Sequence, residues 1–190
     1  MKVWPVKHSP LLRQPERFIA RSELQALIRN VTQNLVNIKD ESGQFLLRLD
    51  DGRVIDTKGW AGWEWTHGVG LYGIYQYYQQ TGDIEMRDII DRCFVEGATT
   101  KNVNTMAPFL TLAYRFEETG RMAYLPWLES WAEWAMHEMP RTEQGGMQHM
   151  TLAEENHQQM WDDTLMMTVL PLAKIGKLLN RPQYVEEAIY

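Results

Sequence analysis

Apolar residues recur at helical spacing along most of the chain. Residues 21–38 carry one apolar stripe that repeats every three or four positions, which is the period of an amphipathic helix. The members of this stripe are Leu24, Leu27, Ile28, Val31, Leu35 and Ile38. Ser22 stands near the start of the segment and is a suitable N-cap, because its hydroxyl can accept a hydrogen bond from a free N–H of the first turn. We therefore expect an amphipathic helix over residues 21–38.

The segments on either side of this stripe lack the helical period. Residues 1–20 contain Pro5, Pro10 and Pro15 without regular apolar spacing, which predicts an irregular N-terminal arm. Residues 44–56 contain the pair Asp51-Gly52, which favours a tight turn between two strands. We expect a short β-hairpin there and helices in the rest of the chain.

Three later stretches of the chain share one arrangement. Each begins with a mostly apolar helix, continues through a turn with a residue suited to left-handed backbone, and ends with a more amphipathic helix. The three first helices are expected over residues 65–80, 105–118 and 164–179, and their turns contain Gly82, Gly120 and Asn180. Residues 140–157 insert a polar loop before the third stretch. A repeat of this size predicts stacked helical hairpins, and hence an all-α fold.

The direction of these helices predicts where a site lies. Short turns make neighbouring helices antiparallel, so the three first helices run parallel and start at the same end of the array. Aromatic or hydrogen-bonding side chains precede all three helices: Trp63, Glu64, Trp65 and His67, then Asn102 and Asn104, then Gln159, Trp161, Asp162 and Asp163. Aromatic faces, amides and carboxylates at positive helix ends suit a sugar with an acidic group.

Composition narrows the classes of function. The chain has 190 residues, of which 44% are hydrophobic and 23% charged, so disorder is excluded as the main state. Its 19 Lys and Arg against 25 Asp and Glu give a net charge of −6, which disfavours nucleic acids and anionic membranes as partners. The single cysteine excludes a disulfide within the chain. The absence of an 18-residue apolar run and of a signal-like start favours a cytoplasmic protein.

The motifs of several enzyme classes are absent. The sequence has no GxSxG, P-loop, GxGxxG or HExxH, which removes serine hydrolases of that type, P-loop enzymes, Rossmann cofactors and zincins. His149 and His157 lack a third ligand at metal spacing, so we expect no metal site. Because the nucleotide-binding motifs are absent, we also expect no cofactor.

Single residues allow more than one interpretation. Asp162 or Asp163 can cap the third first helix or act in catalysis. Trp63 and Trp65 can contact a ligand or belong to the core. Three further tryptophans follow helical spacing and are expected in the core: Trp127, Trp131 and Trp134.

Three motifs of the chain carry a resemblance to a known family. They are Trp63-Glu64-Trp65-Thr66-His67-Gly68-Val69, Glu117-Glu118-Thr119-Gly120, and Gly145-Gly146-Met147-Gln148-His149 followed by Gln159-Met160-Trp161-Asp162-Asp163. Together they resemble the unsaturated rhamnogalacturonyl hydrolases of glycoside hydrolase family 105 and their relatives in family 88, over roughly residues 22–190. The resemblance implies an (α/α)6 toroid of six helical hairpins. Residues 21–190 would then form the N-terminal half of the catalytic domain, with the remaining half as partner.

The resemblance also implies an unusual glycosidase chemistry. The expected substrate is a small galacturonyl-rhamnose oligosaccharide from pectin, whose uronic acid carries a C4=C5 double bond. One Asp protonates C4 and activates a water that adds at C5, after which the ring opens and the glycosidic bond breaks.

The residues of this chemistry follow from the same resemblance. Asp163 matches the acid/base residue, and we expect burial beside Trp161 to keep it protonated. Asn104 stands where the family has a second Asp, and it keeps hydrogen-bonding capacity without the charge. The expected substrate contacts are Trp63, Trp65, Asn104, His149 and Trp161.

Two other interpretations stay open. The chain can belong to another toroid sugar enzyme, either an epimerase that uses two histidines or an ordinary glycosidase that uses two carboxylates. It can also be a non-catalytic helical-repeat scaffold that binds peptides.

Overall fold

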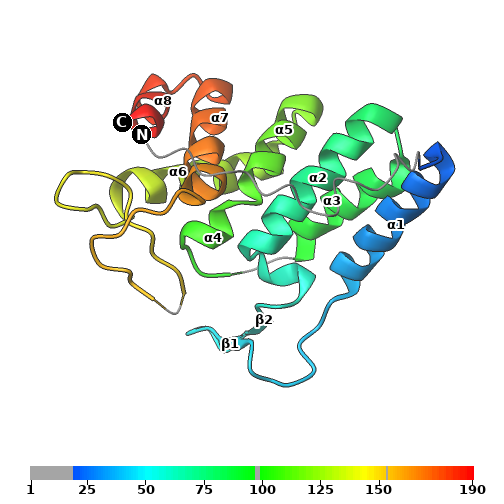
Figure 1. Ribbon diagram of the computed structural model, residues 1–190. Helices are drawn as coiled ribbons and strands as arrows, with labels where there is room; N and C mark the ends of the chain where they lie inside the picture. The colour runs from blue at the N-terminus through cyan, green and yellow to red at the C-terminus, as the bar shows by residue number, and fades with distance from the viewer. Residues whose placement is uncertain (1–18, 97–98, 153) are drawn as a thin grey trace, which may run out of the picture.

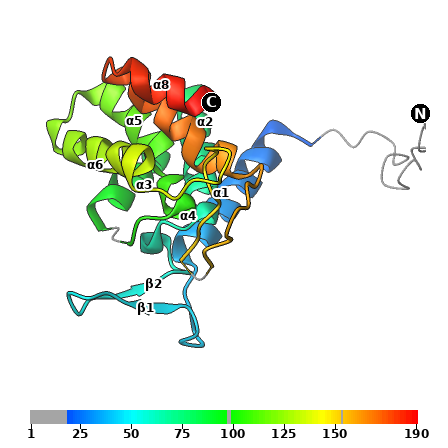
Figure 2. The ribbon, with the colours of Figure 1, turned by 90° about the vertical axis from the view of Figure 1, so that its left-hand side faces the viewer.

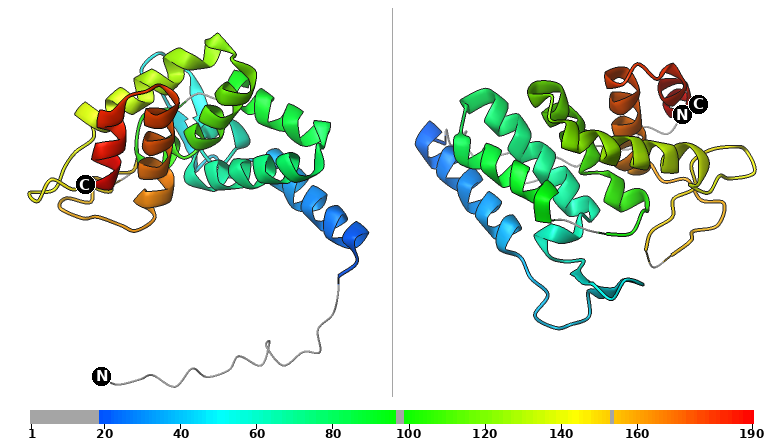
Figure 3. Two further views of the ribbon diagram at one scale, coloured as in Figure 1. Left: turned by 90° about the horizontal axis from the view of Figure 1, so that it is seen from above. Right: turned by 180° about the vertical axis from the view of Figure 1, so that it is seen from behind.

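The computed structural model describes residues 19–96, 99–152 and 154–190, and consists mainly of helices that lie side by side (Figure 1). They are α1 Arg21–Asn37, α2 Trp65–Thr81, α3 Ile84–Glu96, α4 Val103–Met106, α5 Phe109–Thr119, α6 Leu125–His137, α7 Leu170–Leu178 and α8 Pro182–Ile189. Figure 3 shows the hairpins following one another along a curved array. The predicted all-α array is therefore confirmed. Of the arm predicted over residues 1–20, residues 1–18 lie outside the described residues.

The hairpins α2–α3, α5–α6 and α7–α8 confirm the predicted repeat. Their turns have left-handed backbone where the sequence predicts it, with φ of 69° at Gly82, 62° at Gly120 and 54° at Asn180. The N–H of Gly82 donates to the carbonyl of Tyr78, and the N–H of Gly120 donates to that of Phe116. These bonds satisfy carbonyls at the helix ends, so each first helix stops where its turn begins.

The predicted β-hairpin is also present. Strands β1 Leu46–Arg48 and β2 Val54–Asp56 pair antiparallel, with Leu47 opposite Ile55. Gly52 in the connecting turn has a φ of 84°, which suits glycine because it has no Cβ. The hairpin projects from the helices at the end where α2 begins (Figures 1 and 2).

The helix predicted over residues 105–118 is wrong in its first part. Pro108 has no N–H with which to continue a helix, and the chain forms the short α4 followed by α5. A capping box starts α4: the Asn102 side chain accepts the N–H groups of Asn104 and Thr105, and the Thr105 hydroxyl accepts the N–H of Asn102. This box sets the direction in which Asn104 leaves the backbone.

The other helix starts differ from prediction as well. Ser22 is not the N-cap of α1, because Ala20 has the extended backbone at that position and the helix begins before Ser22. The amphipathic helix expected after the turn at Gly120 starts as a 3₁₀ turn over Met122–Tyr124 and then becomes α6.

The helix predicted over residues 164–179 begins as a π-helix. Over Leu165–Val169 the turns are wider, and the N–H of Leu170 donates to the carbonyl of Leu165. Pro171, in the following turn, has no N–H for the usual bond to residue 167, so an ordinary α-helical ladder is interrupted there. The chain then continues as α7.

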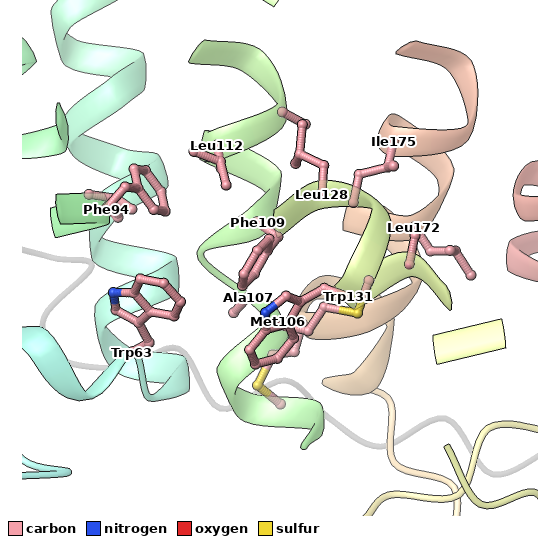
Figure 4. Close-up of a cluster of buried hydrophobic side chains, with 14 of the residues drawn as sticks. Trp63, Phe94, Met106, Ala107, Phe109, Leu112, Leu128, Trp131, Leu172 and Ile175 are labelled. Carbon is pink, nitrogen blue, oxygen red and sulfur yellow. The ribbon is translucent and has the colours of Figure 1, made fainter. Parts of the chain in front are cut away.

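Large aromatic rings fill the core between the helices (Figure 4). The rings of Trp63 and Phe109 meet edge to face with centroids 5.6 Å apart, and Phe109 stacks on Trp131 at 4.4 Å. Leu172 and Ile175 of α7 are fully buried in the same cluster. Offset and edge-to-face contacts of this kind stabilise the packing beyond the area they bury.

Helices α2 and α4 approach each other closely at Gly68. A Cβ added there would lie 2.4 Å from the Cβ of Ala107 and 2.8 Å from the nitrogen of Pro108. We expect Gly68→Ala to lower the free energy of unfolding by about 1–3 kcal/mol, the usual cost of overpacking. Urea unfolding measures this change. Gly73, also in α2, has open space at its Cβ, so Gly73→Ala should raise stability by up to about 1 kcal/mol. Equal stability of the two variants would contradict the close approach.

Candidate active site

The long loop between α6 and the π-helical segment brings three predicted site residues together. The Nδ1 of His149 lies 3.3 Å from Oδ1 of Asp163 and 2.8 Å from Oγ1 of Thr164. The indole of Trp161 stacks on the imidazole of His149, with ring centroids 4.2 Å apart and planes inclined by 5°. We call His149, Trp161 and Asp163 the His149 cluster.

Backbone hydrogen bonds fix the loop that carries this cluster. Gly145 has a φ of 90°, and the N–H of Thr142 donates to the carbonyl of Gly146, so the chain reverses before His149. The N–H of His149 then donates to the carbonyl of Gln159 at 2.8 Å. The two halves of the sequence motif are thus tied together, and the imidazole is held against the residues that follow Gln159.

Burial decides the charge of His149. Its side chain is only 2% exposed. This desolvation lowers the pKa of the imidazole below its usual value, and the Asp163 carboxylate acts in the opposite direction. The ring is therefore neutral at pH 7. A neutral imidazole can contact Asp163 and Thr164 without forming an ion pair with the carboxyl group.

Asp163 is open rather than buried. Its side chain is 51% exposed, and Trp161 stacks on His149. The sequence leads us to expect Asp163 to be buried beside Trp161. This expectation is wrong for the part of the chain that the structure describes. The N-cap position before the π-helical segment is taken by Thr164, without a side-chain capping bond. The carboxylate of Asp163 is thus exposed to a ligand at the end of the loop.

A further carboxylate lies at the start of α2. The Nδ2 of Asn104 donates to Oε2 of Glu64 at 3.0 Å. Partial burial raises the pKa of the Glu64 carboxyl above its usual value, while the hydrogen bond from Asn104 acts in the opposite direction. Glu64 is not among the site residues predicted from the sequence, although its place between two tryptophans at a helix start is a signal.

The groups described so far lie at one end of the array. Glu64 precedes α2, and Asn104 belongs to α4, whose first N–H, that of Val103, donates to the carbonyl of Met150 in the long loop at 3.1 Å. The hydroxyl of Thr168 in the π-helical segment donates to the carbonyl of Val103 at 3.4 Å. The starts of the three first helices therefore meet at one end (Figure 1), as the parallel arrangement predicts.

The two tryptophans before α2 have different environments. Trp63 is 1% exposed, its Nε1 donates to the carbonyl of Cys93, and the rings of Phe109 and Trp127 lie against it. The left-handed backbone of Trp63, with a φ of 56°, turns this residue into the core, so its predicted role as a substrate contact is wrong. Trp65 begins α2 and is 49% exposed. Its ring remains a candidate sugar contact.

The predicted core stripe on α6 is confirmed at two of its three positions. Trp131 and Trp134 are buried, whereas Trp127 is 40% exposed and covers the edge of Trp63. Among the described residues, no group of three His, Cys, Asp or Glu side chains could hold a metal ion. None of the described helices is long and apolar enough to cross a membrane.

A pocket of about 350 Å³ opens beside Trp161. Its walls include Gly146, Met160, Leu165 and the end of α8. A Cβ at Gly146 would lie 2.1 Å from the sulfur of Met160, so glycine lets the methionine side chain lie on the loop. Walls of this apolar character suit the CH faces of a sugar ring.

The candidate site combines an acid, a neutral imidazole and exposed tryptophans at the helix starts of a hairpin array. This combination is typical of carbohydrate-active enzymes with an α/α fold. Residues 37–190 match the family described as Glycosyl Hydrolase Family 88, and the chain belongs to this family. The resemblance inferred from the three motifs is therefore confirmed. The unsaturated rhamnogalacturonyl hydrolase YesR of Bacillus subtilis (strain 168) is 31% identical over 133 residues, which cover 67% of this chain and 39% of that protein.

Two crystal structures are similar to the whole chain. One is of a possible member of the GH105 family from Klebsiella pneumoniae subsp. pneumoniae, with 96% identity and a TM-score of 0.85. The other is of a possible member of the same family from Salmonella enterica subsp. enterica serovar Paratyphi A, with 82% identity and a TM-score of 0.83. The chain covers 51% of each of those chains, which agrees with the predicted half of an α/α toroid.

Proposed function

We propose that this chain supplies the acid/base residue of a glycoside hydrolase for unsaturated galacturonyl-rhamnose oligosaccharides from pectin. The reaction is hydration of the C4=C5 double bond, with Asp163 as general acid and base. The observation that carries the proposal is the half-exposed Asp163 carboxylate, held 3.3 Å from a buried His149. The similarity to YesR, an unsaturated rhamnogalacturonyl hydrolase, supports the substrate class.

A single carboxyl group can carry out both proton transfers of this reaction. Protonated Asp163 gives its proton to C4, and the resulting carboxylate takes a proton from the water whose oxygen bonds to C5. Water is thereby added across the double bond, and Asp163 returns to its starting form. The hydrated C5 is a hemiketal, so the ring opens, and the hemiacetal left at C1 releases the rhamnose.

The neighbouring acid does not provide the second carboxylate of an ordinary glycosidase. Such enzymes place two carboxyl groups about 5–9.5 Å apart on either side of the bond. Asp162 and Asp163 are consecutive, and consecutive side chains at a helix start point about 100° apart. In the proposed mechanism neutral His149 orients Asp163, and Trp161 supplies an aromatic face beside the site.

The surroundings of the reaction belong to the same proposal. The enzyme acts in the cytoplasm without a metal or cofactor, and the remaining half of the toroid closes the other side of the site. The curved array of hairpins in Figure 3 supports a ring that further hairpins complete.

The test uses the absorbance of the conjugated double bond. Unsaturated galacturonyl-rhamnose disaccharides released from pectin by a lyase should lose this absorbance on incubation with the intact enzyme, and rhamnose should appear in equal amount. The saturated galacturonyl-rhamnose disaccharide is the matched control and should remain intact. Cleavage of the saturated sugar at a similar rate would favour an ordinary glycosidase, and no change in either sugar would refute the proposal.

Trp65 is expected to stack on the sugar. Covering about 60 Å² of its ring contributes about 1.5 kcal/mol at about 25 cal/mol per Å², so Trp65→Ala should raise KM about tenfold. Trp65→Phe keeps an aromatic face and should recover part of the loss. Steady-state kinetics on the unsaturated disaccharide measure both variants. A Trp65→Ala enzyme with unchanged KM would show that the ring does not touch the substrate.

A further inference from the structure

Glu64 is a partly buried carboxylate at the start of α2. It occupies the N-cap position of α2, where a short polar side chain usually caps the helix, yet it makes no side-chain capping bond. The hydrogen bond from Asn104 joins it to a residue of another helix. No lysine, arginine or histidine among the described residues pairs with it.

Such a placement is costly unless the carboxylate has another partner. Taking a carboxylate out of water without a positive neighbour is unfavourable, and hydrogen bonds from the Asn104 amide and the Trp65 backbone offset only part of the cost. The raised pKa of Glu64 reflects this burial. Carboxyl groups with this combination of burial and raised pKa are candidates for contact with a ligand.

The position of Glu64 fits such a contact. Glu64 is next to the exposed ring of Trp65 and is itself partly exposed. The loop of the His149 cluster joins α4 through the bond from Val103 to Met150, so it ends on the same side of the array as Glu64. A sugar that stacks on Trp65 would lie beside the residue that carries this carboxylate.

We propose that Glu64, oriented by Asn104, is a second carboxyl group of the active site and accepts hydrogen bonds from hydroxyls of the sugar that Asp163 acts on. The inference rests on the proposed function. The amide of Asn104 holds Oε2, so the carboxylate is presented in one orientation, and a carboxylate has acceptor sites for two adjacent hydroxyls. Glu64 thus binds the substrate, while Asp163 transfers the proton.

The first test separates substrate binding from turnover. A hydrogen bond to a charged group contributes about 1.5–3 kcal/mol, so Glu64→Ala should raise KM at least about tenfold and lower kcat much less. Glu64→Gln keeps one acceptor oxygen and should give an intermediate KM. Glu85, exposed and paired with Arg29, follows the far end of α2, so Glu85→Gln should leave KM and kcat unchanged.

The second test changes the partner of Glu64. Asn104→Asp would place two carboxyl groups about as close as the present 3.0 Å contact, so the pair would retain a proton to higher pH. Because Glu64 must be ionised to accept two hydrogen bonds, the acidic limb of kcat/KM should move to higher pH. Adding Glu64→Gln to Asn104→Asp should remove most of that shift. A purely structural role would alter the melting temperature without moving this limb.

The outcomes distinguish the two proposals. If the unsubstituted enzyme fails to hydrate the unsaturated disaccharide, both proposals fall. If it is active but Glu64→Ala leaves KM unchanged, the Glu64 proposal alone is overturned. Should Glu64→Ala fail to fold, the pH profile of Asn104→Asp decides, and an unmoved acidic limb overturns the proposal.

Discussion

Replacing Asp163 with asparagine is expected to slow turnover at least about 100-fold, the lower range for a general acid–base group. Asparagine has nearly the same shape but cannot give or take the proton, so the dissociation constant of the substrate should change little. The side chain is 51% exposed, and the fold should tolerate the change. Loss of the double-bond absorbance gives kcat, and titration calorimetry gives the dissociation constant.

Asp162→Asn is the matched control, because it removes the adjacent carboxylate. It should cost about 1 kcal/mol or less of stability and little activity. If Asp162→Asn stops the reaction and Asp163→Asn does not, the acid is Asp162. If neither change slows turnover, the hydration mechanism must be abandoned for this chain.

Trp63→Ala is expected to lower the free energy of unfolding by about 3–5 kcal/mol, the range for removing a large aromatic from a core. Trp63 is 1% exposed and contacts Phe94, Phe109 and Trp127. Its removal also leaves the carbonyl of Cys93 without the indole donor. Urea unfolding followed by circular dichroism measures the loss.

The stability of Trp63→Ala is compared with that of Trp65→Ala, which removes the tryptophan on the other side of Glu64. Its ring is half exposed, so this variant should lose about 1 kcal/mol or less while it weakens substrate binding. A larger loss of stability from Trp65→Ala than from Trp63→Ala would contradict the environments described for the two rings.

The hairpins could be predicted from the sequence because their signals are local. The apolar period marks each first helix, and a residue suited to positive φ marks each stop, as at Gly82 and Gly120. The apolar period continues across Pro108, so periodicity alone does not predict the break between α4 and α5. The π-helical start at Leu165–Val169 left no pattern that periodicity detects.

The site was less predictable, since its contacts join distant residues. Trp63 and Trp65 lie two positions apart before one helix, and only the left-handed backbone at Trp63 sends it inward. Glu64 and Asn104 come from different hairpins, so their hydrogen bond depends on how α2 packs against α4. His149 and Asp163 belong to one sequence motif, and the loop between them folds so that their side chains lie 3.3 Å apart.

The wide π-helical turn before α7 allows the orientation of Asp163 to change independently of the packing of α7. A π-helical turn accommodates one more residue than an α-helical turn, so residues before Leu165–Val169 are rotated relative to those after it. Losing that extra residue would swing Asp163 by about 100° around the axis, while Leu172 and Ile175 could stay in the core. Inserting or deleting a single residue here would therefore change the direction of the acidic side chain. The packing of the hydrophobic core would stay the same.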